Sequence, residues 1–262
     1  MGWIIKEKKP SEYHFMIDGV SSFKYGIRVA TVAKIDTPKP KYHDFDDVLG
    51  RNGTTSSFMG TYDNKTMEFS CSFVNDNKLK ESWYNQYRKI KNWIMSANDN
   101  SMVHRLQQSD DAEWYMNIEK ADISECERTG HMVGSFTITF TLDPFDWSIG
   151  GEKWRTIDDI RYNPYIECYP LWRIVNHTGV NNDFAISVNG NDPITVLNCE
   201  SDREYYIDTE LLLTYSKYPY QEGIYRAGRS GLEEKARLAP GRNVIDVTPG
   251  FVVTCKPRWR SL

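Results

Sequence analysis

The sequence lacks the features that identify disulfide-rich, metal-binding and membrane proteins. Its five cysteines are scattered, odd in number and form no C-x-x-C pair, so we expect neither a disulfide framework nor a zinc site. No apolar run approaches the roughly 20 residues of a membrane-spanning helix. The apolar run near the N-terminus, Trp3 to Ile5, is too short for a signal peptide. We therefore expect reduced thiols, synthesis in the cytoplasm and no membrane insertion.

Catalytic motifs are also missing. The sequence contains no G-x-S-x-G, Walker loop, G-x-G-x-x-G or H-E-x-x-H, and its five histidines stand in unrelated surroundings. We therefore expect no enzyme and no cofactor. One alternative is a glycosidase or peptidoglycan hydrolase that uses Asp208 and Glu210, which share one face of an expected strand. Two acids at this spacing are more typical of a solvated strand face.

Charge and length limit the remaining classes. The net charge of −4 argues against nucleic-acid sequence recognition. Aromatic residues make up 13% of the chain, and their rings suit β-sandwich interiors and protein interfaces equally. A chain of 262 residues is long enough for two domains of ordinary size.

The stretch Val133 to Trp147 predicts where the first domain ends. Four apolar residues alternate with three threonines from Phe136 to Leu142, which is typical of a strand with one buried face. Asp143 and Pro144 are expected to stop the pairing, because proline has no amide proton to donate. We predict an N-terminal domain over residues 1–147 and a C-terminal domain over residues 148–262.

The first half reads as a β domain with one helix. Residues 13–29 predict a hairpin with a turn at Asp18-Gly19 and a second strand through Tyr25. One helical face is expected near residues 79–94, capped by Asp76 or Asn77, and it carries Leu79, Trp83, Tyr87, Ile90 and Ile94.

The segment from Ile35 to Lys65 has few apolar residues. A long segment without its own core commonly serves a function, which makes it a candidate for docking on another subunit. The simpler alternative is a mobile surface loop or an extended polar hairpin.

The second half predicts a β-sandwich. Short strands are expected at residues 169–175, 204–213, 243–247 and 251–256, and two more within residues 184–197. The turn that joins those two, at Asn189-Gly190 and Asn191-Asp192, is the strongest local signal. Residues 216–237 form a second long polar insertion.

The order of these features resembles the distal tail proteins of long-tailed bacteriophages (siphophages). In the first half the matching segments are FMIDGVSSFKYGI, a P-x-P run followed by VLGRNG, a helix ending RKIKNWI, and F-x-I-x-F-x-L-D-P-F. In the second half they are ISVNG, YYIDTE, LAPGRNVI and KPRWR. The resemblance covers essentially the whole chain, although the insertion at residues 216–237 is longer and more aromatic than the pattern needs.

This resemblance implies a mainly β fold with an N-terminal β-sandwich-like, tail-tube-like domain that carries one α-helix, followed by a C-terminal galectin-like β-sandwich. It implies a non-enzymatic homo-hexameric ring in the virion tail, assembled in the host cytoplasm. Its implied partners are the tail tube protein, the tail-tip hub protein, and receptor-binding or baseplate proteins.

The sequence offers candidate residues for a protein interface and, as an alternative, for saccharide binding. The residues proposed for a subunit or partner interface lie on the two polar segments and are Arg51, Asn52, Tyr62 and Tyr225. The alternative function is a carbohydrate-binding host-adhesion protein. The ring expected to stack on a host saccharide is Tyr218, Tyr220, Tyr225 or Trp172. Aromatic rings suit saccharides and protein interfaces alike.

Overall fold

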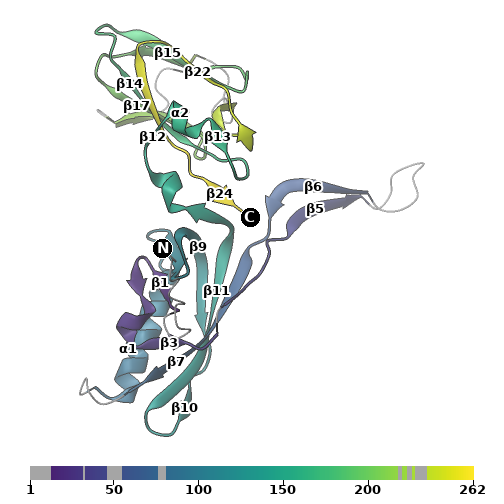
Figure 1. The fold of residues 1–262 in the computed structure, drawn as a ribbon, viewed down its shortest axis with the longest axis vertical. Coiled ribbons are helices and arrows are strands. Elements are labelled where there is room, and N and C mark those ends of the chain that lie inside the picture. Colours follow the sequence, from purple (N-terminus) through teal and green to yellow (C-terminus); the bar gives the residue numbers. More distant parts are fainter. Residues whose placement is uncertain are drawn as a thin grey trace, which may run out of the picture. The chain divides into compact units, whose positions relative to one another are not determined.

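The structure is a computed structural model that describes residues 13–31, 33–45, 55–75, 81–217, 220–222, 226–227 and 235–262. It is mainly β with one main helix, which confirms the predicted fold class (Figure 1). The chain divides into two compact units, residues 1–146 with Leu262, and residues 147–261. Among the described residues no helix is both long and apolar enough to cross a membrane. The ring-forming and galectin-like roles of the two domains stay predictions.

One large sheet organises the first unit, in the order β2-β1-β8-β9-β11-β7-β3, with β4 paired to β7 and β10 to β11. Its strands are β1 (Phe15–Ile17), β2 (Val20–Ser21), β3 (Ile27–Val29), β4 (Lys34–Ile35), β7 (Lys65–Val74), β8 (His104–Gln108), β9 (Asp111–Ile123), β10 (Glu127–Thr129) and β11 (Val133–Ser148).

The longest strand pair sets the two faces of this sheet. Strands β7 and β11 pair antiparallel without interruption from Val133 opposite Val74 to Leu142 opposite Lys65. The alternating apolar residues of β11 are buried, as predicted, and they share one core with helix α1 (Trp83–Met95). Because successive side chains of a strand point to opposite faces, the threonines between them lie on the other face.

The prediction that strand pairing stops at Asp143-Pro144 is only partly right. Pairing with β7 does end at Leu142, but extended geometry continues to Ser148. Proline is compatible with an extended backbone, and its missing N–H removes no hydrogen bond to β7, because pairing with β7 has already ended.

The N-terminal hairpin is only half as long as predicted. The turn at Asp18-Gly19 is confirmed, with φ of 50° and 76°. The prediction that the second strand continues beyond Ser21 is wrong, because Ser22–Tyr25 form a 3-10 helix. Strand β3, which follows this helix, pairs with β7 and not with β1. The Ser21 hydroxyl accepts the Phe23 N–H and starts that helix, and Gly26 ends it in the left-handed region.

The helix also begins later than predicted. The Ser82 hydroxyl accepts the Asn85 N–H at the start of α1, so the cap prediction of Asp76 or Asn77 is wrong for this helix. Those two residues and Leu79 lie outside the described residues. The remaining members of the predicted apolar face pack against the core.

The segment between Ile35 and Lys65 forms a hairpin. Strands β5 (Pro40–Phe45) and β6 (Thr55–Tyr62) pair antiparallel with each other in a two-stranded sheet of their own. Within the first unit this hairpin extends away from the large sheet (Figure 1). Of the two simpler alternatives, the extended hairpin is therefore the observed one. We call residues 40–45 and 55–62 the arm.

Two larger sheets enclose the core of the second unit, and β13 (Tyr162–Asn163) and β21 (Gly241–Arg242) pair in a separate two-stranded sheet. A six-stranded sheet has the order β12-β23-β14-β17-β18-β19, and a four-stranded sheet has the order β20-β16-β15-β22. Apolar residues of both sheets lie in one core, as expected for a sandwich. The strands are β12 (Arg155–Thr156), β14 (Leu171–Asn176), β15 (Asn182–Val188), β16 (Ile194–Cys199), β17 (Glu204–Asp208), β18 (Leu213–Lys217), β19 (Tyr220–Glu222), β20 (Arg226–Ala227), β22 (Ile245–Val247) and β23 (Phe251–Lys256).

The turn predicted between two of these strands is confirmed. Asn189 and Gly190 have φ of 56° and 72°, which are the values that a tight hairpin turn needs. The turn joins β15 to the segment that leads into β16, and the two strands pair antiparallel.

Candidate functional site

Three aromatic residues form a strip along the arm, and two of them are exposed while Tyr62 is partly buried. Tyr42 and Phe58 are partners across the hairpin, and their ring centroids lie 6.0 Å apart. The Phe58 and Tyr62 rings follow at 5.4 Å. Tyr42 is 55% exposed and Phe58 is 47% exposed, while Met59 is 58% exposed. We call Tyr42, Phe58 and Tyr62 the arm strip. Large apolar groups gathered on a protruding element mark an interaction surface.

The base of the arm is fixed to the end of β11. The Tyr62 ring lies edge-on to Phe145, with centroids 6.1 Å apart. The Lys65 ammonium contacts the Asp146 carboxylate at 2.6 Å, although the Lys65 side chain is only 1% exposed. The Asp63 N–H donates to the Lys39 carbonyl across the hairpin. These contacts hold the arm strip in a defined direction from the sheet of the first unit.

The outward face of β7 and β11 is rich in hydroxyl groups. Ser72 lies opposite Ser135, Ser70 opposite Thr137, and Thr66 opposite Thr141 in the register. We call eight outward side chains between Thr66 and Ser72 and between Ser135 and Thr141 the hydroxyl face; they are Thr66, Glu68, Ser70, Ser72, Ser135, Thr137, Thr139 and Thr141. The outward pair Val74 and Val133 lies beyond this face at one end of the two strands. Neutral hydroxyl groups hydrate well and carry no net charge.

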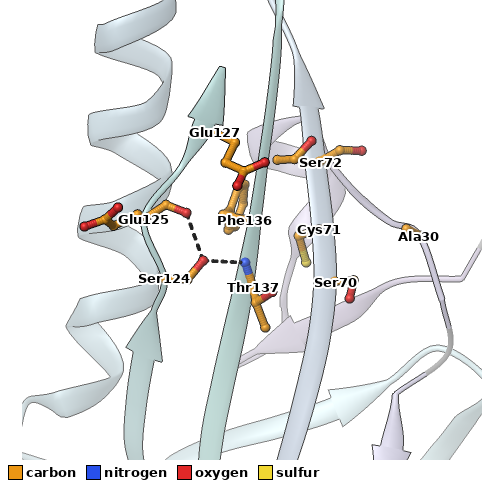
Figure 2. Close-up of a pocket in the computed structure, with 10 residues that line it drawn as sticks. Ala30, Ser70, Cys71, Ser72, Ser124, Glu125, Glu127, Phe136 and Thr137 are labelled. Carbon is orange, nitrogen blue, oxygen red and sulfur yellow. Dashed lines mark hydrogen bonds between the residues drawn. The ribbon is translucent and has the colours of Figure 1, made fainter. Parts of the chain in front are cut away.

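A groove hollows the hydroxyl face where β9 ends (Figure 2). The Ser124 hydroxyl accepts the Thr137 N–H at 2.9 Å and donates to the Glu125 carbonyl at 2.9 Å. Glu127 reaches toward the groove from the β10 side (Figure 2). Burial raises the pKa of the Cys71 thiol to about 12, so this thiol stays protonated and is no nucleophile. The groove therefore does not supply an activated cysteine.

The acid pair proposed for a hydrolase is instead part of a structural ion cluster. Strand β17 ends at Asp208, and Glu210 follows in a turn, so the two acids do not share a strand face. Arg258 contacts both Asp208 oxygens, at 2.7 and 2.8 Å, and contacts Glu210 at 3.0 Å. The prediction of one shared face failed because the strand ends earlier than its sequence pattern indicates.

The environment of Asp208 holds this carboxylate charged. Burial alone raises the pKa of Asp208, but hydrogen bonds from Arg258 and from the Leu211 and Glu210 N–H groups outweigh burial and lower it. A general acid needs the opposite shift. Among the residues that the structure describes, no group of three His, Cys, Asp or Glu side chains is placed to hold a metal ion.

The residues predicted for a subunit interface or for saccharide stacking do not gather in one site among the described residues. Trp172 is fully buried, and its indole N–H donates to the Ala236 carbonyl at 3.0 Å, so its proposed role in stacking on a saccharide is wrong. Tyr62 lies on the arm strip. Tyr220 lies in β19. The remaining candidates fall outside the described residues; they are Arg51, Asn52, Tyr218 and Tyr225.

Sequence reasoning missed Tyr42 and Phe58 as site residues. A signal was present, since Phe58 and Tyr62 are four residues apart and therefore share a face of a strand. The pairing of Tyr42 with Phe58 depends on the register of the hairpin, which the sequence pattern alone does not define.

Comparison with known proteins assigns the family. The family model of the phage tail protein N-terminal domain matches residues 11–144, which is just over half of the chain. No curated protein matches. The crystal structure of the Dit protein (gp 19.1) of phage SPP1, described as a paradigm of the hub adsorption apparatus in phages that infect Gram-positive bacteria, is similar in fold.

That likeness extends over the whole fold. The TM-score is 0.62 at 12% sequence identity, and the match covers 95% of this chain and 98% of that chain. The resemblance to distal tail proteins is thereby confirmed, in family by the N-terminal domain and in fold by both halves. The chain belongs to the family of phage tail proteins that share this N-terminal domain.

Proposed function

We propose that the chain is a ring-forming hub at the distal end of a siphophage tail, where it joins the tail tube to the tail-tip and host-adsorption proteins. The observation that carries this proposal is the arm strip, an exposed aromatic surface on a hairpin with a fixed base, in a phage tail protein. Six copies that contact head to tail close into a ring, because each copy presents one patch and receives another. Assembly takes place in the host cytoplasm before the ring joins the virion.

In this ring the arm of one copy lies on the next copy. Burying the exposed faces of Tyr42 and Phe58 removes apolar surface from water, which stabilises the contact by roughly 25 cal/mol per Å². The rigid base reduces the entropy lost when the arm docks. Arg51, Asn52 and Tyr225 remain proposed interface residues on this account.

The hydroxyl face suits the wall of the central channel. A channel that passes DNA works best when its wall neither binds the phosphate backbone nor offers apolar patches, since cationic side chains form salt-dependent contacts with phosphates. Seven of the eight side chains on this face are neutral hydroxyl groups, and the eighth, Glu68, is an acid.

Replacing Phe58 with aspartate tests the arm. A carboxylate cannot be buried in an apolar contact without a partner, and the few residues that dominate an interface each cost about 2 kcal/mol or more when they are truncated. We expect the Phe58→Asp variant to have the mass of a monomer in light scattering under conditions in which the wild type forms rings. Deletion of residues 38–62 is expected to have the same effect.

Phe23→Asp is the matched control. Phe23 is also an exposed phenylalanine of the first unit but lies outside the arm. This variant should assemble like the wild type, and both variants should keep the wild-type circular dichroism spectrum. Unchanged rings with Phe58→Asp would refute docking by the arm strip.

The proposed hub has no catalytic activity. The pairing of Asp208 with Arg258 supports this, because it occupies both carboxylate oxygens. The wild-type protein should release no soluble fragments from bacterial cell walls. Turnover that is lost in an Asp208→Asn variant with the wild-type circular dichroism spectrum would establish the hydrolase alternative instead.

A further inference from the structure

The outer face of the six-stranded sheet in the second unit carries an aromatic surface. Arg173, Tyr206 and Tyr215 lie opposite one another on β14, β17 and β18, in one row across the sheet. Their sequence neighbours Trp172, Ile207 and Thr214 are buried, so the row itself lies on the face away from the sandwich core.

Three rings of this face lie close together. The Tyr206 and Tyr215 rings are stacked, with centroids 5.3 Å apart and an interplanar angle of 16°. The Trp154 ring lies 6.3 Å from Tyr206. Trp154 is 39% exposed, and both tyrosines are partly exposed. We call Trp154, Tyr206 and Tyr215 the aromatic platform.

Polar groups around the platform are held in place by one another. Glu204 accepts a hydrogen bond from the Tyr206 hydroxyl at 2.6 Å and forms an ion pair with Arg173. Arg173 and Lys256 also lie over the Trp154 ring, at 5.9 and 5.0 Å from its centroid. Burial and the nearby Glu204 raise the pKa of Tyr206 to about 12, so its hydroxyl keeps its proton as a donor.

We propose that the aromatic platform binds a neutral hexopyranose saccharide. The C–H face of a pyranose ring is apolar and stacks on aromatic rings, while its hydroxyl groups need donors and acceptors at fixed positions. Arg173, Lys256 and Glu204 supply both. Arg173 and Glu204 neutralise each other, which leaves a single positive charge, that of Lys256, among these three groups, and this favours a neutral ring over a polyanion that needs several cations.

A saccharide fits this surface better than a protein does. Protein interfaces use about 20–30 residues on each side and are depleted of lysine and glutamate at their centre. The platform instead consists of three rings among three charged side chains. The inference goes beyond the hub proposal, since a ring can assemble with or without a saccharide on the second unit.

Binding by the full-length protein tests the inference. We would screen an array of neutral hexopyranose di- and trisaccharides and titrate the best one in free form by calorimetry. We expect saturable binding that Trp154→Ala and Tyr215→Ala each weaken by at least about tenfold. Trp154→Phe, which keeps a ring, should retain most of the affinity.

The control is Tyr162→Ala, which removes an exposed tyrosine elsewhere in the second unit. It should bind like the wild type. Raising the salt concentration to about 0.5 M should change the affinity for the saccharide by less than about twofold from its low-salt value, because stacking is not screened by ions. The inference is overturned if the wild type binds no saccharide on the array, or if Tyr162→Ala loses as much affinity as the two platform variants.

Discussion

Replacing Asp208 with alanine is expected to lower the free energy of unfolding of the second unit by about 3–5 kcal/mol. Asp208 is almost fully buried, at 3% side-chain exposure, and it accepts two hydrogen bonds from Arg258. Removing this carboxylate leaves the guanidinium group partly buried, with Glu210 as its carboxylate contact. Calorimetric unfolding of the full-length protein measures the loss in the transition of the second unit.

Glu210→Ala is the matched control for this prediction. Glu210 is 41% exposed and contacts the same guanidinium group, so its loss should cost less than about 1 kcal/mol. Similar unfolding transitions for Asp208→Ala and the wild type would contradict a structural role for the Asp208–Arg258 pair.

The pH dependence of stability should change in the same variant. The folded-state pKa of Asp208 is lowered, so the ion pair contributes stability above the ordinary carboxyl pKa. This contribution is lost as the pH falls below about 4 toward the folded-state pKa. Between neutral pH and this acid range, the wild type should therefore lose more stability than Asp208→Ala does.

Replacing Asp146 with alanine is expected to lower the free energy of unfolding of the first unit by about 3 kcal/mol. The reason is that Lys65, at 1% exposure, keeps a buried ammonium group without the carboxylate that contacts it. The double variant Lys65→Met, Asp146→Ala should recover most of this loss, because methionine fills a similar volume without a charge. Calorimetric unfolding of the wild type, the two single variants Asp146→Ala and Lys65→Met, and the double variant gives the coupling energy.

Asp63→Ala provides the control at the base of the arm. Asp63 forms an exposed ion pair with Lys41 at 3.5 Å, and exposed pairs contribute little to stability. If the double variant is no more stable than Asp146→Ala, the buried lysine is not the cause of the loss.

The predictions from sequence succeeded where one face of a strand is buried and the other is not. The alternation from Phe136 to Leu142 identified β11 and its buried face, because a shift of one residue would expose every apolar side chain. The turns at Asp18-Gly19 and Asn189-Gly190 were predictable because few residues other than glycine, asparagine and aspartate tolerate positive φ.

The predictions failed where tertiary contacts or side-chain hydrogen bonds determine the local structure or the burial of a residue. An alternating pattern continues through Tyr25, but a hydrogen bond to the Ser21 hydroxyl starts a 3-10 helix there. Trp172 lies in a strand whose orientation depends on which face meets the second sheet, and burial makes it a core residue. Asp208 is recognisable as structural only once Arg258, 50 residues away in sequence, is placed beside it.

The candidate interface was predictable only as a segment. Few apolar residues between Ile35 and Lys65 pointed to an element without its own core, and the arm is that element. The arm strip depends on the hairpin register, and the aromatic platform depends on the order of strands in a sheet. Both arise from residues distant in sequence, which explains why neither was found from the chain alone.

The measurement that tests the central claim most directly is the solution mass of the wild-type protein by light scattering, with negative-stain images of the same fraction. A homo-hexamer has a mass of about 180 kDa, six times the 30.5 kDa of the chain, and its images should show rings with a central hole. A protein that stays monomeric at every concentration, alone and with the tail tube protein, would contradict the ring-forming hub.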